Sequence, residues 1–279
     1  MAHHLSEAGF DLHIGDARSD VLQSFLDANR CKRFNLDGHA DLDAIITMLP
    51  DGQTVHSVLL GSKHVRGYAS RIRPGGLVID MSSSAPIGTR ALGAALAERN
   101  ISMVDAPVAG GVVFAENKSL SVLTGGDAGN LERCKPLFGA MASNVFYCGP
   151  LGSGHALKAL CNYVNAASLI ALLEAMTTAR QFGIETETVV SVLRSATTER
   201  NHPLEKKIVP HVMTRRFKTG MALGLIAKDL GIATDLAKAL SIDVPIMESC
   251  SSVWNQAVTQ FGFNADQTEI ARAWDKATQ

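Results

Sequence analysis

The sequence lacks an excess of charge of either sign. Lys and Arg together number 26 and Asp and Glu 27, which leaves a formal net charge of −1. A protein that binds a polyanion usually carries a basic patch and a positive net charge. We therefore expect no nucleic-acid partner.

Long hydrophobic runs are missing as well. A run such as Leu169–Leu173 is far shorter than the ~20 apolar residues that a membrane span requires. The first residues carry His3, His4 and Glu7 in place of the basic start and apolar stretch of a secretory leader. We expect no membrane association.

Paired cysteines are absent too. The thiols are odd in number, far apart and without a C-x-x-C pair, so we interpret them as reduced thiols of a cytoplasmic protein. They are Cys31, Cys134, Cys148, Cys161 and Cys250. The neighbours His3 and His4 could suggest a metal site, but adjacent side chains on a helix point in different directions. We therefore expect no metal.

The length of 279 residues suffices for two domains. In the first half, β-type runs alternate with helical runs, which predicts a parallel sheet covered by helices on both faces. The expected strands are Leu12–Ile14, Ala44–Leu49, Leu77–Met81, Ile101–Asp105, Leu120–Thr124 and Val145–Cys148. The expected helices between them include Ala17–Ala28, Ile87–Arg99 and Gly129–Met141.

The second half reads as helical throughout. A long helix is expected from about residue 154, because apolar residues recur there at steps of three and four. Further helices are expected over Glu185–Ser195, Glu205–Thr214, Leu223–Leu240, Pro245–Phe261 and Gln267–Ala277. We predict a sheet domain over 1–149 and an all-helical domain over 150–279.

Polar segments follow three of the expected strands, at Met48–Asp51, Asp80–Ser84 and Asp105–Gly111. In open parallel sheets, ligands bind beyond the carboxyl ends of the strands. One shared cleft is therefore expected at these ends.

Lys158 is the strongest candidate for chemistry. It lies one turn into the long helix, with Asn162 four and Asn165 seven residues further on the same face. A lysine beside a cleft can transfer a proton, and an asparagine can hold a substrate oxygen. The alternative is a lysine that only reaches out of an interface. The preceding Gly149–Gly154 has the spacing of a phosphate loop but lacks the Lys-Ser/Thr that must follow, so we interpret it as a joint that lets a helix start close to another backbone.

Five motifs together resemble the β-hydroxyacid dehydrogenases, the family of 3-hydroxyisobutyrate dehydrogenase and tartronate semialdehyde reductase. They agree in order and spacing from Met1 to about Trp274. They are Asp105–Gly111 with Ala115 and Gly125-Gly126, Gly152-x-Gly154-x-x-x-Lys158-x-x-x-Asn162, Lys228-Asp229-Leu230, Ile46–Pro50, and Ile79–Ser83.

The resemblance implies a role for each site residue. Lys158 would protonate the carbonyl oxygen as hydride arrives and deprotonate the alcohol in reverse. The residues implied to bind substrate are Ser82, Gly110, Gly111 and Asn162. Those implied to bind the nicotinamide cofactor are Leu49, Pro50, Thr54, Ser83 and Lys228.

Two positions depart from the family. Residue 109 is alanine where many relatives have serine, which removes a hydroxyl from the substrate site. Relatives also begin with a strand and G-x-G-x-x-G, whereas Met1–Gly9 here corresponds to the helix that follows them. In the usual strand order 3-2-1-4-5-6, this predicts unpaired backbone on both neighbours of the first strand. A start placed too late and a genuine loss of cofactor binding both remain open.

Asp16 comes at the end of the expected strand Leu12–Ile14, which corresponds to the second strand of the family. An acidic residue at this place hydrogen-bonds the ribose 2′-hydroxyl of NAD. Arg18 could instead favour the 2′-phosphate of NADP, so NAD is expected and NADP stays possible.

The sequence thus predicts a Rossmann-type domain and a helical domain that together oxidise a small β-hydroxy acid reversibly. The alternatives are a cofactor-deficient oligomeric scaffold and an imine reductase. The helical half carries more apolar faces than it can bury, so a homodimer or homotetramer is expected.

Overall fold

The computed structural model describes residues 1–37, 42–62, 64–196 and 203–275. The chain divides into two compact units, unit 1 over Met1–Lys158 and unit 2 over Ala159–Gln279. The division falls after the expected boundary at residue 149, because the first turn of the long helix packs with unit 1.

The larger sheet of unit 1 has six strands within the described residues. In spatial order they are β3 (Leu42–Thr47), β4 (Ile72–Asp80), β5 (Ser102–Asp105), β7 (Leu120–Gly125) and β6 (Val108–Ala109), with β8 (Ala142–Gly149) also paired to β7. The first three are parallel, and so are β7 and β8. The sheet is therefore mostly parallel, as expected.

One part of the sheet departs from the expected parallel pairing. β7 runs antiparallel to both β5 and β6. The helix between β6 and β7 is α5 (Val112–Glu116), whose five residues rise only about 7.5 Å. A parallel crossover must return along a whole strand, which a helix of this length cannot do.

A separate two-stranded sheet holds β1 (His13–Ile14) and β2 (Lys32–Arg33), which pair in parallel. In the part of the chain that the structure describes, β3 ends the larger sheet and pairs only with β4. The unpaired edges of β1 and β3 agree with the prediction of unpaired backbone on both neighbours of the family's first strand.

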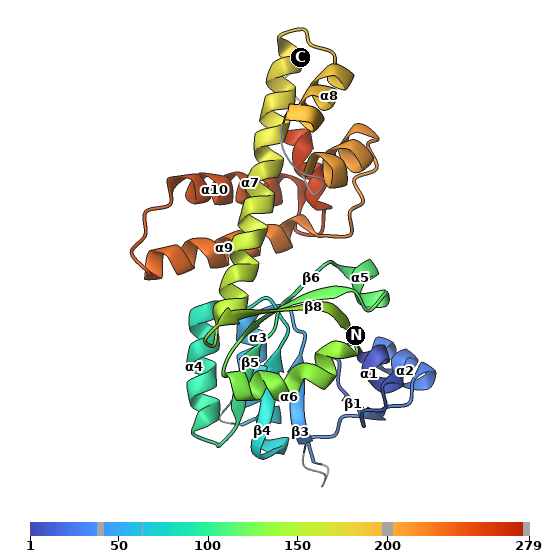
Figure 1. Cartoon of the computed structure of the whole chain (residues 1–279), viewed down its shortest axis with the longest axis vertical. Helices are drawn as coiled ribbons and strands as arrows, with labels where there is room; N and C mark the ends of the chain where they lie inside the picture. The colour runs from blue at the N-terminus through green and yellow to red at the C-terminus, as the bar shows by residue number, and fades with distance from the viewer. Residues whose placement is uncertain (38–41, 63, 197–202, 276–279) are drawn as a thin grey trace. The chain divides into compact units, whose positions relative to one another are not determined.

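Helices cover both faces of the larger sheet (Figure 1). Alternate residues of β4 point to opposite faces. Leu77 and Ile79 pack in one core with Leu5 and Phe138, whereas Val78 packs in the other with Leu59. The helices of unit 1 are α1 (Ala2–Glu7), α2 (Ser19–Ala28), α3 (Gly52–Leu60), η1 (Tyr68–Arg71), α4 (Pro86–Ala97), α5 and α6 (Ala128–Gly139).

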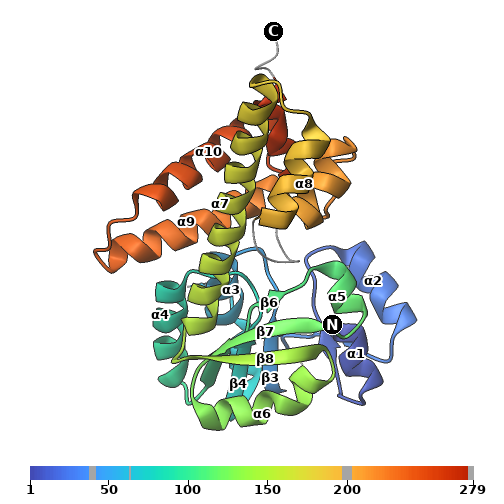
Figure 2. The ribbon, with the colours of Figure 1, turned by 45° about the horizontal axis from the view of Figure 1, so that its top comes forward.

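Unit 2 is helical throughout its described residues. Trp254, Leu169, Leu223 and Ile270 are fully buried at the centre of its core. Its elements are α7 (Ser153–Gln181), which begins in unit 1, then α8 (Thr186–Ala196), η2 (Leu204–Met213), α9 (Leu223–Ala239), α10 (Pro245–Phe261) and η3 (Gln267–Ala273). α9 and α10 lie side by side as a hairpin (Figure 2).

By length and composition alone, α7 could cross a membrane. However, Leu169, Leu172 and Leu173 are buried in the core of unit 2. The helix is therefore interpreted as a core helix of a globular unit, whose apolar residues are spaced for packing rather than gathered in one run.

Several helices differ from their expected form. The expected helix over Glu205–Thr214 is the π-helix η2, and the one over Gln267–Ala277 is the 3-10 helix η3. Residues 276 and 277 lie outside the described residues. The elements α3, α5, β2 and β6 were not expected. A two-residue strand such as β2 or β6, or a helix as short as α5, shows no periodicity.

Candidate functional site

Asp80, at the end of β4, organises the carboxyl ends of two neighbouring strands. Its buried carboxylate accepts a hydrogen bond from the Thr47 hydroxyl of β3 at 2.9 Å and another from the Ser84 hydroxyl at 2.8 Å. The backbone N–H of Ser82 donates to it at 3.0 Å. A buried carboxylate must be satisfied in this way, and the result is a rigid loop over 82–84.

Ser82 and Leu49 meet directly. The Leu49 N–H donates to the Ser82 hydroxyl oxygen at 2.9 Å, so the loop after β3 is fastened to the loop after β4. Ser82 is buried, Leu49 and Ser83 are half-buried, and Pro50 is exposed. Residues expected on the substrate side and on the cofactor side are thus brought together, while their roles stay predictions.

Asp105, at the end of β5, binds the start of α7. Its carboxylate is fully buried and accepts the N–H of Gly152 at 2.6 Å and that of His155 at 2.8 Å. The first backbone N–H groups of a helix have no partner within the helix. Asp105 supplies that partner from a distance of about fifty residues in sequence.

Two glycines make this approach possible. A Cβ on Gly154 would lie 2.2 Å from the carbonyl oxygen of Leu123, and one on Gly125 would lie 2.4 Å from a carboxylate oxygen of Asp105. No side chain fits at such separations. The sequence interpretation of Gly149–Gly154 as a joint of close backbone approach is confirmed at Gly154.

His155 completes the attachment of α7 to unit 1. Its Nε2 lies 3.1 Å from the carbonyl oxygen of Ser82, and its Nδ1 lies 2.8 Å from the hydroxyl of Thr89 in α4. A carbonyl oxygen only accepts, so Nε2 carries a proton. Asp80 and Asp105 flank the ring at 3.8 and 3.9 Å. The first turn of α7 is thus fixed immediately before Lys158.

Replacing Asp105 by alanine is expected to lower the free energy of unfolding of unit 1 by about 2–6 kcal/mol. The change leaves two buried N–H groups without an acceptor, at about 1–3 kcal/mol each. Urea unfolding followed by circular dichroism measures it. Asp127→Ala is the matched control, because Asp127 also accepts two N–H groups at a helix start but is exposed. Equal losses in the two variants would contradict the importance of burial.

Lys158 is half-buried and is the last residue of unit 1. Asn162 follows one turn later on α7, in unit 2, and is buried. Its side-chain amide donates to Asp229 of α9 at 2.6 Å. Asn165, expected on the same face, is exposed and donates to the Cys161 carbonyl of its own helix.

Lys228 and Asp229 lie together on α9. The Lys228 Nζ is 3.4 Å from Asp229 Oδ1, and Asp229 is buried while Lys228 is half-buried. Asp229 therefore connects Asn162 with Lys228 inside unit 2. The structure adds Asp229 to the candidate residues, and the expected role of Lys228 toward the cofactor stays a prediction.

Gly110 and Gly111 form the turn from β6 into α5. Both have positive φ, +131° and +81°, which only glycine adopts readily. Both are exposed at the surface of unit 1, where their amides can reach a ligand. A Cβ on Gly110 would also lie 2.6 Å from the Cβ of Phe114.

Asp16 and Arg18, the residues expected to contact the ribose of the cofactor, lie after β1. The N–H of Arg18 donates to the Asp16 carboxylate at 2.8 Å, and its guanidinium lies 3.7 Å away. Both side chains are exposed.

A hollow of about 520 Å³ lies elsewhere in unit 1, and among its lining residues are Thr54, Arg66 and Tyr68. Of the described site residues, Thr54 alone lines this hollow.

Sequence reasoning did not assign roles to Asp80, Asp105, His155 or Asp229, although their motifs were recognised. A buried acid beside backbone N–H groups produces no periodic pattern in the sequence.

Sequence reasoning also missed Lys207 in η2. Burial lowers the pKa of Lys207 to about 8, although the charge of Asp266 acts to raise it. A perturbed lysine marks a candidate site, which makes Lys207 a useful comparison for Lys158.

Family comparisons match nearly the whole chain. A family model described as the NAD binding domain of 6-phosphogluconate dehydrogenase matches residues 1–149. A second, described as NAD-binding of NADP-dependent 3-hydroxyisobutyrate dehydrogenase, matches residues 152–274.

Individual relatives agree with these models. An NAD-dependent L-serine dehydrogenase of Pseudomonas aeruginosa is 31% identical over 99% of this chain and 93% of that protein. A solved 3-hydroxyisobutyrate dehydrogenase of Mycobacterium tuberculosis with L-serine has a TM-score of 0.83 at 26% identity, covering 98% and 93% of the two chains. An imine reductase of Myxococcus stipitatus, at 17% identity and a TM-score of 0.63 over 97% and 93%, shares the fold alone.

Proposed function

We propose that this chain, which belongs to the 3-hydroxyisobutyrate dehydrogenase-related family of NAD(P)-dependent oxidoreductases, oxidises a small β-hydroxy acid with Lys158 as its proton-transfer residue. The family resemblance inferred from the motifs is confirmed, and with it a cofactor of the NAD or NADP type. The substrate and the role of each residue are the proposal.

The observation that carries the proposal is the fixed start of α7. Asp105 and His155 hold the first turn of the helix against the ends of β4 and β5. Lys158 follows one turn later, so its backbone has a defined position beside the loops that carry Ser82 and Leu49. A proton-transfer group needs such placement before its acidity matters.

In the oxidation direction, the neutral Nζ of Lys158 accepts the proton of the substrate hydroxyl. A bound dinucleotide would supply the acceptor for the hydride that leaves the carbon bearing this hydroxyl. In the reduction direction, the Lys158 ammonium returns its proton to the carbonyl oxygen. We propose that the amides of Gly110 and Gly111 hold the substrate carboxylate. The resemblance assigns the reacting oxygen to Asn162, one turn after Lys158 on α7.

The residues fit a dinucleotide in part. Asp16 offers an exposed carboxylate at the end of β1, which suits a ribose hydroxyl, and Leu49, Pro50, Thr54 and Ser83 follow the ends of β3 and β4. We therefore assign the ribose and nicotinamide ends to residues of this chain and leave the pyrophosphate unassigned.

The first substrate to test is L-serine. It is a β-hydroxy acid, it is named with two of the relatives above, and it fits a site that binds one carboxylate and one hydroxyl. A panel of L-serine, 3-hydroxyisobutyrate and glycerate, each with NAD and with NADP, tests the proposal by production of reduced cofactor. Turnover of cyclic imines but of none of these acids would favour an imine reductase. Inactivity in the presence of bound cofactor would favour a scaffold.

We further propose a homodimer or larger homo-oligomer assembled through unit 2. Leu240, Ile242 and Ile246, at the connection of α9 and α10, are 60%, 54% and 71% exposed. Apolar side chains gathered in this way usually mark an interface.

Ile246→Glu is therefore expected to shift the sedimentation of the protein toward the monomer. Ile87→Glu, at an equally apolar exposed position of unit 1, is the matched control and should leave the assembly unchanged. A monomeric unmodified chain at micromolar concentration would contradict the proposal.

A further inference from the structure

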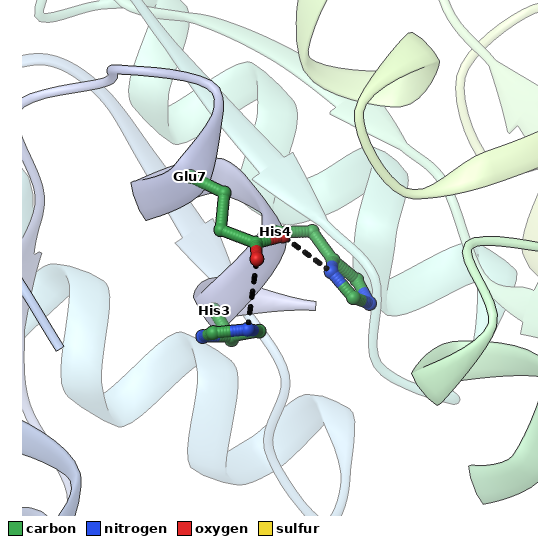
Figure 3. A group of neighbouring side chains, drawn as sticks. All are labelled: His3, His4 and Glu7. Atoms are coloured by element: carbon green, nitrogen blue, oxygen red, sulfur yellow. Dashed lines mark hydrogen bonds and ion pairs between the residues drawn. The ribbon is translucent and has the colours of Figure 1, made fainter. Parts of the chain in front are cut away.

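Three metal-ligating side chains of α1 converge, and none of them has a role in the proposed function. The ring nitrogens of His3 and His4 and the carboxylate of Glu7 lie within 4.8 Å of one another (Figure 3). The sequence reasoning that adjacent histidines point apart is wrong here. Both rings turn toward Glu7, one turn along the helix, and their centroids lie 5.5 Å apart.

The outer nitrogen of His4 is occupied. Its Nε2 lies 2.9 Å from the carbonyl oxygen of Ala115, which can only accept a hydrogen bond. Nε2 therefore carries a proton, and in the neutral ring Nδ1 presents a lone pair. That Nδ1 lies 3.3 Å from Glu7 Oε2.

The outer nitrogen of His3 is occupied in the same way. Its Nδ1 lies 2.6 Å from Asn29 Oδ1, and the Asn29 amide donates to the Phe25 carbonyl, which fixes the side-chain oxygen toward His3. His3 Nδ1 therefore carries a proton, and in the neutral ring Nε2 presents a lone pair. That Nε2 lies 3.2 Å from Glu7 Oε1.

Two neutral imidazoles would thus direct lone pairs at a carboxylate, which is repulsive unless a cation lies between them. Glu7 Oε2 also lies 3.1 Å from the Lys118 ammonium, which favours the charged form of the carboxylate. Either two additional protons or one bound metal ion can satisfy this arrangement.

We infer that His3, His4 and Glu7 form a site for a divalent ion of the zinc type. Imidazole nitrogens with one carboxylate are a common ligand set for Zn²⁺, and bound histidines typically donate their other N–H to a carbonyl. A tetrahedral zinc site separates its ligand atoms by about 3.4 Å. His3 Nε2 lies 3.2 Å from Glu7 Oε1 and His4 Nδ1 lies 3.3 Å from Glu7 Oε2, while the three ligand atoms together lie within 4.8 Å of one another. His3 and Glu7 are exposed, so small rotations of their side chains complete the geometry.

The ion would fasten α1 to two neighbouring segments. Asn29 closes α2, and Ala115 lies in α5, which begins directly after Gly110 and Gly111. The metal would act through hydrogen bonds that already orient its ligands, so it stabilises this edge of unit 1. It is separate from the proposed proton transfer at Lys158.

Lys118 opposes the ion. Its Nζ lies 3.1 Å from Glu7 Oε2, where it competes for a ligand atom and repels a divalent cation. This gives a test in which all three ligands are kept: Lys118→Met should bind Zn²⁺ more tightly than the unmodified chain.

The experiment is calorimetric titration of Zn²⁺ into the 279-residue chain freed of any affinity tag. Glu7→Gln and His4→Asn are expected to weaken binding by about 100-fold, and Asn29→Leu, which frees the outer nitrogen of His3, by about 10–100-fold. His56→Asn is the matched control, since His56 is an exposed helical histidine elsewhere in unit 1. Co²⁺ replaces Zn²⁺ in a second titration, because its visible absorption reports the ligand set.

Three outcomes would overturn the proposal. One is that the unmodified chain binds Zn²⁺ no more tightly than Glu7→Gln does, which would mean that protons alone satisfy the histidines. Another is binding that depends on His3 but on neither His4 nor Glu7, because one histidine beside the terminal amine could explain it. The third is a Lys118→Met chain that folds normally and binds no better than the unmodified one, and this test holds even if the ligand variants unfold.

Discussion

Replacing Lys158 by alanine is expected to lower kcat by about 10²–10⁴-fold, the usual contribution of a general acid–base group. The substrate and the cofactor should still bind, because the anchors of α7 at Asp105 and His155 are unchanged. The loss should therefore appear in kcat with little change in cofactor Kd. These kinetics are to be measured in a form of the chain that binds the dinucleotide and oxidises a hydroxy acid.

Two further readouts separate proton transfer from mere structure. A small primary amine added to Lys158→Ala should restore part of the rate, and Lys158→Arg should stay inactive because a guanidinium does not release its proton. Lys207→Met is the matched control, since burial lowers the pKa of Lys207 to about 8 and this lysine lies outside the motif. If Lys158→Ala turned over like the unmodified chain, or if Lys207→Met lost activity equally, the assignment would fail.

The second large effect is expected from a chain extended at its N-terminus by a β-strand and a G-x-G-x-x-G loop. β1 and β3 each have an unpaired edge within the described residues, and an added parallel strand can pair with both. The loop would supply backbone N–H groups to the pyrophosphate at the start of α1. Two charge-assisted hydrogen bonds at about 1.5–3 kcal/mol each correspond to a gain in NADH affinity of about 10²-fold or more.

Titration of NADH into both chains, followed by its fluorescence, measures this gain. The extended chain should also unfold at higher urea concentration, because the edges of β1 and β3 are then paired. An extension of equal length with glycines replaced by valine is the control, since it adds the strand without the phosphate loop. Equal NADH affinity in all three chains would show that the phosphate site is built elsewhere, and Leu49, Thr54 and Ser83 would then need new roles.

Much of the architecture could be predicted from periodicity. The alternation of strands and helices predicted the sheet of unit 1, and the apolar steps of α7 and α10 predicted those helices to within a residue or two. Long periodic segments bury one face whatever the surrounding chain does, so the pattern itself carries the information. The open edge at β3 was predicted in another way, from the strand order that the family resemblance implies.

Contacts between distant residues could not be predicted in this way. The sequence contains Asp80, Asp105 and His155, but no spacing indicates that Asp105 accepts the N–H groups of Gly152 and His155, or that His155 joins Ser82 to Thr89. These bonds exist because parallel strands end at one edge and a helix begins there. The antiparallel direction of β7 could not be predicted either, because it depends on α5 being too short for a parallel crossover.

The sequence by itself determined the family, the cofactor class, the two-part fold and the candidate Lys158, because each of these depends on residue types at short or regular spacing. Only the tertiary structure decided which side chains orient them. At α1 it even reversed the sequence expectation: Asn29 and Ala115, distant in the chain, hold the outer nitrogens of His3 and His4 and so turn both rings toward Glu7. A side chain's direction is set by its hydrogen-bond partners as much as by its helical position, and those partners are known only once the chain has folded.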